Sequence, residues 1–328
     1  MHITTDPLSI PLAPRALARG CAVTIGNFDG VHLGHQALIR RTVARASEAG
    51  LPAVAITFDP HPLRVIKGLD GQDAPPQIIS LEHKLECFAA LGINLALVMP
   101  FTLETAARSP EDFARTILAD CLHTRTLVVG YDYALGKSRR GDAALLAELG
   151  REHGFTVEQL PALHLHGDIV SSTRIRELLH RGEVAHAAQL LGRPHSVEGR
   201  VVWGRSRGGS LLGFPTANLG MDEDLLLPAG GVYAVLAELA PKRQSLLGVW
   251  TGSSGSYLKG AANVGSNPTF GDEPLRVETH LLDFHADIYD FFFRVYFIER
   301  LRDERKFNGA SELMEQIRRD IARVREIL

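Results

Sequence analysis

The fold of the first half of the chain is decided by the stretch Thr24-Ile25-Gly26-Asn27-Phe28-Asp29-Gly30-Val31-His32-Leu33-Gly34-His35. An apolar run, residues 21–25, precedes it and predicts a buried strand, and apolar residues at helical spacing follow it as far as Gly50. The stretch therefore lies on the turn from a strand into a helix N-terminus, where free N–H groups and the helix dipole favour an anion. His32 and His35 are three residues apart, so they can face the same point. Such a corner can bind a triphosphate and stabilise the charge that develops as pyrophosphate leaves, which is the chemistry of nucleotidyl transfer.

The same corner also has a purely structural interpretation. Its glycines would permit tight packing, and its histidines would be polar surface residues, which is the commoner meaning of two histidines at this spacing. However, three glycines, an asparagine and an aspartate share the turn. This concentration favours the functional interpretation.

The composition is that of a globular protein with two domains. The chain has 328 residues, of which 45% are hydrophobic and 22% are charged, so each domain can bury a core of its own. A formal net charge of −3 gives no basic field that would attract nucleic acid or an anionic membrane. The cysteines (Cys21, Cys87 and Cys121) are far apart in the sequence. The N-terminal residues lack the apolar core of a signal peptide, and no window of the sequence approaches a membrane span. We therefore expect reduced thiols in a cytoplasmic protein.

The first half of the chain alternates short apolar runs with amphipathic helices. This alternation predicts an α/β domain with a doubly wound parallel sheet, in which ligands lie beyond the carboxyl ends of the strands. Helices are expected to begin after Ser80 and after Ser109, the latter with Pro110 in its first position. The expected strands are residues 21–25, 53–58, 95–99, 126–129 and 156–160.

The second half changes character after a helical segment between Gly182 and Arg193, which we interpret as the connection between domains 1–186 and 187–328. Short apolar runs divided by Gly, Pro, Ser and Asp follow without intervening helices, and they predict a closed or nearly closed antiparallel β-barrel. The chain ends in an amphipathic C-terminal helix that is expected to pack on the barrel through a stripe of Leu313, Ile317, Ile321 and Val324. The expected strands are residues 197–203, 231–238, 246–251, 261–264, 276–284 and 292–297.

The opening stretch resembles the G-N-F-D-G-V-H-x-G-H signature of the nucleotidylyltransferase superfamily. Its phenylalanine and aspartate narrow the match to the FMN adenylyltransferase branch, as found in prokaryotic bifunctional riboflavin kinase/FAD synthetases. The resemblance implies that His32 and His35 are catalytic. It also implies that the nucleotide is bound by Gly26, Asn27, Phe28, Asp29 and Gly34.

Two segments that follow later strands are similar to the same family. Residues 57–62, T-F-D-P-H-P, would alone be a proline-rich turn, but they resemble the family's F-D/E-P-H-P segment. Residues 129–142 resemble its V-G-x-D-F-x-F-G loop and imply nucleotide binding by Asp132. The first segment implies flavin contacts from Phe58, Asp59, Pro60 and His61.

Residues 171–176, S-S-T-R-I-R, have two interpretations. Their hydroxyls can cap a helix expected from Arg174 to His180, with the arginines as ordinary surface residues. They also resemble the superfamily's second signature, I-S-S-T-x-x-R, in which hydroxyls and an arginine hold the ATP phosphates. The resemblance implies nucleotide binding by Ser171, Ser172 and Thr173. From the spacing we expect Arg176, more than Arg174, to neutralise the departing pyrophosphate.

The run from Gly204 to Asn218 carries the strongest signal of the second half. As a glycine-rich loop before a strand it would be a flexible hairpin and nothing more. Its end, L-G-F-P-T-A-N, resembles the riboflavin kinase signature. The resemblance implies that Thr216 and Asn218 hold Mg²⁺, whose octahedral preference suits oxygen ligands completed by phosphates and water. It also implies nucleotide binding by Gly204, Gly208, Gly213 and Pro215.

Two later strings are similar to the same kinase. Residues 263–270 resemble its N-I/V-G-x-x-P-T-F loop and imply flavin contacts from Asn267 and Thr269. Residues 277–284 resemble V-E-x-H-I/L-L-D-F and imply that Glu278 is the general base on the ribityl 5′-hydroxyl. Further on, Asp290 follows Tyr289 where the family has a glycine.

Glu278 also has a structural alternative. Alternation along the expected strand makes Glu278 and His280 point the same way. We expect the carboxylate to lie inside the barrel mouth, where it is costly unless it is paired or catalytic. A salt bridge with Arg276 is the alternative to the catalytic role.

Together these segments imply two consecutive reactions with ATP, riboflavin and FMN as substrates. The C-terminal domain would phosphorylate riboflavin with MgATP, and the poor alcohol nucleophile explains the carboxylate base. The N-terminal domain would join FMN to AMP from a second ATP, where the nucleophile is an ionised phosphate and positioning suffices. The alternatives are a kinase with an inactive N-terminal half, a transferase with a different acceptor, and a flavin carrier without activity. We expect no nucleic acid or membrane partner, and a transient homo-oligomer is left open.

Overall fold

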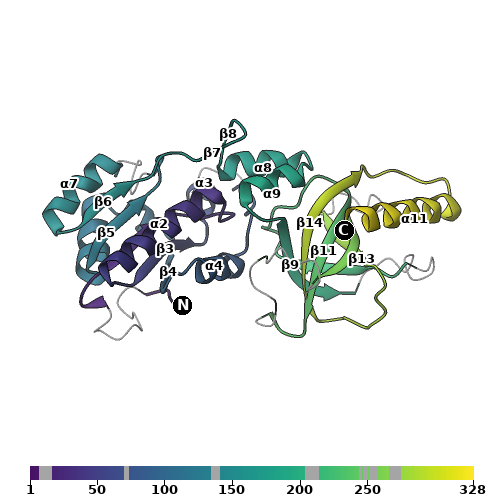
Figure 1. Ribbon diagram of the computed structural model, residues 1–328, viewed down its shortest axis with the longest axis horizontal. Coiled ribbons are helices and arrows are strands. Elements are labelled where there is room, and N and C mark those ends of the chain that lie inside the picture. The colour runs from purple at the N-terminus through teal and green to yellow at the C-terminus, as the bar shows by residue number, and fades with distance from the viewer. Residues whose placement is uncertain are drawn as a thin grey trace. The chain divides into compact units, whose positions relative to one another are not determined.

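The computed structural model describes residues 1–6, 17–69, 74–133, 141–203, 214–243, 246, 250, 257–265 and 275–328. The chain forms two compact units, which Figure 1 shows with their helices and strands labelled. The first unit comprises Met1–Gln77 and Leu81–Val170, and the second comprises Ile78–Ser80 and Ser171–Leu328. The assignment of domains to residues 1–186 and 187–328 stays a prediction.

The first unit is built, within its described residues, on a six-stranded parallel sheet. The strand order reverses at β2, which pairs with β3 on one side and with β5 on the other. Such a reversal opens a crevice beyond the carboxyl ends of the two diverging strands. The predicted doubly wound sheet is confirmed, and an edge strand that was not predicted, β1, is added to it. In spatial order the strands are β1 (His2–Thr4), β4 (Leu95–Pro100), β3 (Ala53–Asp59), β2 (Cys21–Ile25), β5 (Thr124–Val129) and β6 (Thr156–Gln159).

Helices connect these strands, and the predicted helix starts after Ser80 and Ser109 and the predicted end at Gly50 are confirmed. Ser109 accepts a hydrogen bond from the N–H of Asp112 at the start of α6, whose first residue is Pro110. Gly50 ends α2 with a left-handed φ of 63°. The helices are α2 (Leu33–Ala49), α3 (Pro62–Leu69), α4 (Leu81–Ala90), α5 (Leu103–Ala107), α6 (Pro110–Phe113), the π-helix η1 (Ala114–Cys121) and α7 (Ala143–His153); a hairpin of β7 (His164–Leu165) and β8 (Asp168–Ile169) follows.

The second unit contains a closed antiparallel barrel, which confirms the second predicted fold. Along β13, Val277, Thr279 and Leu281 are buried in the barrel interior, and the residues between them are partly exposed. In spatial order the described strands are β10 (Ala217–Met221), β13 (Arg276–Leu281), β12 (Leu258–Gly265), β11 (Gly231–Ala240), β14 (Phe292–Arg302) and β9 (His195–Val202). The predicted strand over residues 246–251 falls mostly outside the described residues.

Three helices accompany the barrel: α8 (Ser172–His180), α9 (Val184–Leu191) and α11 (Ala310–Ile327). The apolar stripe predicted for the last helix packs on the barrel, because Ile321 and Val324 contact a cluster that includes Ala234 and Ala261. Ala261 lies opposite His280 across the β12–β13 pair, so this packed face is the outer wall of the barrel.

A buried ion cluster lies on another part of this outer wall. The Arg294 side chain is fully buried and donates from Nε and Nη2 to Oε2 of Glu198, at 2.8 and 2.5 Å. Glu198 also accepts hydrogen bonds from Arg243 at 2.6 Å and from the hydroxyl of Ser80 at 2.5 Å. Burial would raise the pKa of Glu198, but the charges of Arg294 and Arg243 hold it below its ordinary value. The cluster therefore ties the segment Ile78–Ser80 to the barrel by charge-assisted hydrogen bonds.

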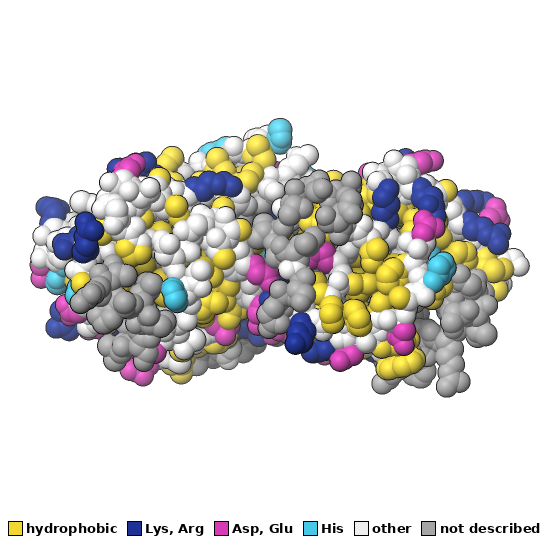
Figure 2. Space-filling model, turned by 60° about the horizontal axis from the view of Figure 1, so that its bottom comes forward, with side chains coloured by type: hydrophobic (Ala, Val, Ile, Leu, Met, Phe, Trp, Pro, Cys, Tyr) yellow, Lys and Arg dark blue, Asp and Glu magenta, His cyan; other side chains and the backbone are white. Residues whose placement is uncertain are grey.

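Some hydrophobic side chains of the second unit reach the surface, and Figure 2 shows where such side chains gather on one of its faces. The large ones that are exposed in the described part of this unit are Val202, Trp203, Leu275 and Tyr289. None of the helices in the described part of the chain has both the length and the apolar composition that crossing a bilayer requires.

Two candidate nucleotide sites

The first candidate site forms at the carboxyl end of β2, where the strand order of the sheet reverses. β2 is buried along its whole length, and the N–H of Gly26 still bonds to the carbonyl of Ile56 on the neighbouring strand. The chain then turns sharply, with positive φ at Phe28 (50°), Gly30 (84°) and Val31 (40°). This turn leads directly into α2, so the first N–H groups of that helix face the crevice of the sheet.

The two histidines of the motif lie together at the start of α2, as their spacing predicts. His32 caps the helix, and its Nδ1 accepts a hydrogen bond from the N–H of His35 at 3.3 Å. The two rings stack with centroids 3.6 Å apart and an interplanar angle of 18°. A side chain at Gly34 would crowd the His32 ring, because a Cβ there would lie 3.2 Å from it. The glycine thus allows the imidazole of His32 to fold over the first turn of the helix.

Phe28 and Asp29 lie beneath this pair of histidines. The Phe28 ring is buried and makes edge contacts with His35 and Phe88, at centroid distances of 5.3 and 5.2 Å. Asp29 is also buried. Both residues were predicted to bind the nucleotide. The Phe28 ring therefore supports the His35 ring, and nucleotide binding by Phe28 and Asp29 stays a prediction.

A buried lysine, which the sequence analysis missed, belongs to the same region. Lys84 of α4 is only 2% exposed and lies near the carboxylates of Asp29 and Asp59. Burial lowers the pKa of Lys84. The negative charges of the two carboxylates act in the opposite direction but are the smaller effect. An isolated buried ammonium is costly, and the nearby carboxylates of Asp29 and Asp59 reduce that cost.

The segment predicted to contact the flavin begins with the last two residues of β3, the neighbour of β2. The hydroxyl of Thr57 donates to the carbonyl of Asn27 at 3.3 Å, which joins this segment to the first motif. Asp59 and Pro60 are exposed, whereas Phe58 is half-buried. His61 is buried, and its Nδ1 accepts a hydrogen bond from the N–H of Leu63 at 3.2 Å. The sheet thus brings the segment to the same edge as the histidines.

Asp132 follows β5, which pairs with β2 on its other side. Its side chain is exposed, and the loop is closed by a hydrogen bond from the N–H of Tyr133 to the carbonyl of Gly130 at 3.2 Å. The loops after β2, β3 and β5 therefore all end at one edge of the sheet. The remainder of the predicted loop, residues 134–140, lies outside the described residues.

The second signature, residues 171–176, begins the second unit, whereas the histidines belong to the first. Ser171 caps α8, and its hydroxyl accepts a hydrogen bond from the N–H of Arg174 at 3.2 Å. The predicted capping by a hydroxyl of this segment is therefore confirmed. Arg174 pairs with Glu177 at 3.1 Å. Ser172, Thr173 and Arg176 lie on the first two turns of the same helix.

The second candidate site lies on the barrel wall, where β10 pairs with β13. Asn218 is directly opposite Glu278, and Glu278 is directly opposite Asn263 on the next strand. Residues that face each other in this way have side chains on one face of a sheet, with Cβ atoms about 5 Å apart. The proposed metal ligand and the proposed base are therefore neighbours. Thr216, the other proposed ligand, lies two residues before Asn218 and is exposed.

The position of Glu278 differs from the prediction in one respect. The residues that point into the barrel are Val277 and Thr279, whereas Glu278 and His280 are partly exposed on the outer wall. The expectation that the carboxylate lies inside the barrel mouth is therefore wrong. A side chain on the wall keeps contact with water, so it avoids the desolvation cost that was expected for it.

His280 anchors the segment that carries the proposed metal ligands. Its Nδ1 lies 2.9 Å from the carbonyl oxygen of Pro215, and its ring makes an edge contact with Phe214 at 5.6 Å. Pro215 itself is exposed. The remaining predicted residues of this unit lie outside the described residues: Gly204, Gly208, Gly213, Asn267 and Thr269.

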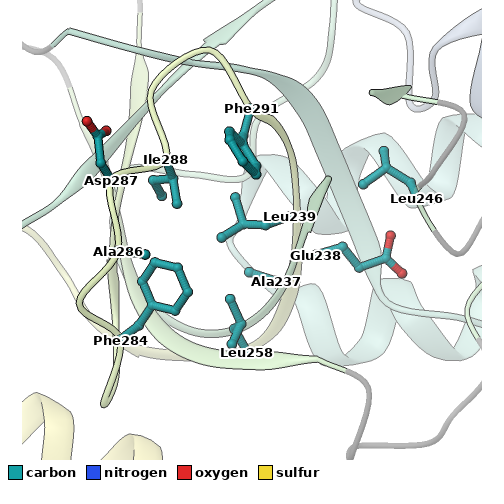
Figure 3. A pocket seen from close by; sticks show the side chains of 10 residues that line it. All are labelled: Ala237, Glu238, Leu239, Leu246, Leu258, Phe284, Ala286, Asp287, Ile288 and Phe291. Carbon is teal, nitrogen blue, oxygen red and sulfur yellow. The ribbon is translucent and has the colours of Figure 1, made fainter. Parts of the chain in front are cut away.

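A cavity of about 440 Å³ lies at the end of the barrel where β11 ends and β12 begins. Figure 3 shows Phe284, Ile288 and Phe291 of the loop after β13 around it, together with Leu239 and Leu258 of the barrel. Glu238 and Asp287 are the acidic residues of its lining. Its lining includes none of the site residues that the sequence predicted.

The described residues hold no group of three or more His, Cys, Asp or Glu side chains that could bind a metal ion by themselves. A hydroxyl and an amide, as at Thr216 and Asn218, suit a cation that takes most of its ligands from phosphates and water. The donor set of the barrel wall therefore fits magnesium bound together with a nucleotide.

Comparison with known proteins assigns a different family to each half of the chain. The sequence pattern of FAD synthetase matches residues 15–174, and that of riboflavin kinase matches residues 191–328. The chain is 37% identical over 301 residues to the bifunctional riboflavin kinase/FMN adenylyltransferase of Listeria monocytogenes, which covers 91% of this chain and 89% of the relative. It is 35% identical over 312 residues to the Escherichia coli protein of the same name, and the aligned region covers 95% of this chain and 94% of that relative. The crystal structure of a Streptococcus pneumoniae protein named macrolide-efflux protein has the same fold, with a TM-score of 0.80, 28% identity and 98% of both chains covered.

Proposed function

The chain belongs to the family of bifunctional riboflavin kinase/FMN adenylyltransferases, and we propose that the two sets of residues described above carry out its two reactions. The chain phosphorylates riboflavin and adenylylates FMN, with ATP as the second substrate of both reactions. ATP-dependent transfer implies a divalent metal, and we propose that this metal is Mg²⁺.

The kinase reaction is proposed for the barrel wall. Glu278 accepts the proton of the ribityl 5′-hydroxyl while the hydroxyl oxygen bonds to the γ-phosphorus of ATP and ADP leaves. Thr216 and Asn218 would hold Mg²⁺, which neutralises charge on the phosphates. The observation that carries this proposal is the direct pairing of Asn218 with Glu278 across β10 and β13. This pairing supports the proposal because it sets the proposed metal ligand beside the proposed base.

The adenylyl transfer is proposed for the corner between β2 and α2. An oxygen of the FMN phosphate attacks the α-phosphorus of ATP, and pyrophosphate leaves. His32 and His35 donate hydrogen bonds to the triphosphate from the start of α2, where the helix dipole also favours negative charge. Their stacked, edge-supported rings support this role, because fixed donors need no reorganisation during the reaction. Arg176 is proposed to neutralise the pyrophosphate.

The remaining residues are proposed to bind substrates. For the adenylyl transfer we propose nucleotide contacts from residues 26–29, Gly34, Asp132 and the hydroxyls of residues 171–173, and flavin contacts from residues 58–61. For the kinase we propose nucleotide contacts from Pro215 and the glycines at 204, 208 and 213, and flavin contacts from Asn267 and Thr269.

The proposal is tested by analysing the products that the protein forms from riboflavin, ATP and MgCl₂. Chromatography should resolve FMN first and FAD later, and a chelator should stop FMN formation. Supplying FMN in place of riboflavin should give FAD and pyrophosphate in equal amounts. Formation of FMN alone would refute the adenylyl transfer assigned to His32 and His35.

A further inference from the structure

A buried lysine of the first unit has no part in either proposed reaction. Lys84 lies on α4 and is only 2% exposed, although a lysine is almost never fully buried unless it is paired. The carboxylates that act on its ammonium are those of Asp29, which has the stronger influence, and Asp59. A buried ion pair adds little stability compared with apolar side chains of the same size. The place of Lys84 beside the first candidate site therefore points to a role in that site.

The face of α4 that carries Lys84 packs against the first motif. Phe88 is four residues after Lys84, so the two side chains share one face of the helix. The Phe88 ring makes an edge contact with the ring of Phe28 at 5.2 Å, and Phe28 in turn contacts the ring of His35 at 5.3 Å. Asp29 follows Phe28 directly and is 3% exposed. One turn of α4 thus supports the ring beneath His35 and places a cation near the neighbouring carboxylate.

The second carboxylate near Lys84 comes from the end of β3. Asp59 is the last residue of this strand, and its carbonyl accepts a hydrogen bond from the N–H of Phe101, after β4, at 3.0 Å. The same end of β3 is joined to the first motif by the hydrogen bond from Thr57 to the carbonyl of Asn27. Lys84 therefore lies near acidic residues from two loops that meet at the carboxyl edge of the sheet.

The charge of Asp29 lies close to the groups that are proposed to bind the triphosphate. Asp29 precedes His32 by three residues, and the adjacent Phe28 ring contacts the ring of His35. Because the Asp29 side chain is buried, salt and water screen its charge only weakly. A negative charge in this position repels the phosphate groups of ATP and opposes the field of the α2 N-terminus. A cation near Asp29 cancels this repulsion.

We propose that Lys84 is a positioning residue for the adenylyl transfer, which supplies the counter-charge to Asp29 that allows the corner between β2 and α2 to accept the triphosphate of ATP. This assignment rests on the proposed adenylyl-transfer site at His32 and His35. Lys84 acts through Asp29 and does not touch the reacting atoms. It sets the affinity of the corner for phosphate groups and leaves the affinity for the adenosine part of ATP unchanged.

The test is the KM for ATP in FAD formation from added FMN. Lys84→Met removes the charge and keeps an unbranched side chain, and it should raise this KM about tenfold. Lys84→Gln, measured in parallel, should do the same, so the test does not depend on the folding of one variant. Partial unfolding would lower the amount of active enzyme and not change the KM. The control Cys87→Ala, at a buried uncharged residue of α4, should leave the KM unchanged.

Inhibition of the same reaction by two ligands separates lost charge from a general disturbance of the site. Pyrophosphate carries only phosphate groups, whereas adenosine carries none. Lys84→Met should weaken inhibition by pyrophosphate about tenfold and change inhibition by adenosine less than about twofold. Equal weakening of both would overturn the proposal, as would a normal KM for ATP in both Lys84 variants.

A double-mutant cycle tests whether Lys84 acts through Asp29. In the Asp29→Asn background there is no charge at this position to compensate, so Lys84→Met should raise the KM for ATP by less than about threefold, compared with about tenfold in the unmodified protein. An equal rise in both backgrounds would overturn the proposal, whatever effect Asp29→Asn has by itself. A protein that forms no FAD from FMN would refute the proposed function. An active adenylyltransferase in which the two substitutions act independently would refute only the role of Lys84.

Discussion

The two candidate sites use different kinds of backbone to place their side chains. In the first unit the proposed catalytic histidines follow an irregular turn with positive φ at Phe28, Gly30 and Val31, which ends in a helix N-terminus. In the second unit they lie on regular strands, where the register alone puts Asn218 opposite Glu278. In the roles proposed above, the first arrangement would direct N–H groups and imidazoles at an anion, and the second would direct oxygen atoms at a cation and a hydroxyl group.

This difference follows from the two nucleophiles. The phosphate of FMN is already ionised, so a site for its attack needs donors that stabilise charge and hold the reactants in place. The hydroxyl of riboflavin must lose a proton, so its site needs a carboxylate. A turn at a helix start offers many N–H donors, whereas a strand presents single side chains at a fixed spacing. The comparison predicts that each site can be disabled without the other.

The largest effect is expected from Glu278→Gln. Loss of the base should lower kcat for riboflavin phosphorylation about 10²–10⁴-fold and leave FAD formation from added FMN unchanged. The matched control is Glu299→Gln on β14, an exposed glutamate that pairs with Arg323, and it should keep both activities. If Glu278→Gln phosphorylated riboflavin at the normal rate, the barrel wall would not be the kinase site as described.

Arg294→Met should produce the largest loss of stability in the barrel. It removes one partner of a buried ion pair and leaves Glu198 with fewer counter-charges, which typically costs about 3–5 kcal/mol. Both tryptophans belong to the second unit, so their fluorescence during urea unfolding follows the barrel. Arg319→Met, which breaks an exposed pair with Glu315, should cost less than about 1 kcal/mol. Similar losses in the two variants would contradict the burial assigned to Arg294.

His35→Ala should mirror the effect of Glu278→Gln in the first unit. Loss of a preorganised donor at the triphosphate should slow FAD formation from FMN about 10²–10³-fold and spare riboflavin phosphorylation. His164→Ala, at an exposed histidine of the same unit, is the control and should leave FAD formation intact. An equal loss of both activities in His35→Ala would show that the division between the two sites is wrong.

The smallest effect concerns pH. His195 on β9 is buried, its Nε2 lies 2.9 Å from the carbonyl oxygen of Leu226, and burial lowers its pKa from 6.5 to about 4. Between these values the unfolded chain binds a proton at this site that the folded barrel does not. The barrel should therefore lose stability as the pH falls from about 6.5 to about 4, by at most about 3 kcal/mol from this residue.

Urea unfolding at pH 7 and pH 4.5, followed by tryptophan fluorescence, measures this loss. The variant His195→Gln cannot take up a proton in this range, so its stability should fall less with pH than that of the unmodified protein. The same decrease in both proteins would assign the pH dependence to other groups.

Much of both folds could be predicted because the local hydrophobic pattern of the sequence agrees with the burial of the same residues in the folded protein. The buried strands 21–25 and 53–58 are continuous apolar runs, and α11 shows its packed face directly in its apolar stripe. The pairing of His32 with His35 follows from helical spacing alone. The strand that carries Glu278 was also predicted, but its inward face was assigned wrongly, because alternation shows which residues share a face and not which face is inside.

The residues that were missed depend on contacts between distant segments. Lys84 looks like a surface residue of an amphipathic helix, and only the packing of α4 buries it near Asp29 and Asp59. Arg294 on β14 looks like an ordinary strand arginine until Glu198 is brought opposite it by the barrel. Trp203 and Tyr289 meet only because the loop before β14 returns to the end of β9. No local sequence pattern predicts these contacts.

The central claim is that two separate sites carry out the two reactions, and mixing two inactive variants tests it most directly. Neither Glu278→Gln nor His35→Ala alone should convert riboflavin and ATP into FAD, the first for lack of FMN and the second with FMN accumulating. Combined in one tube, the His35→Ala protein should supply FMN to the Glu278→Gln protein, and FAD should form. If the mixture makes no FAD although the Glu278→Gln protein converts added FMN, or if either variant alone makes FAD at the normal rate, the two-site account is contradicted.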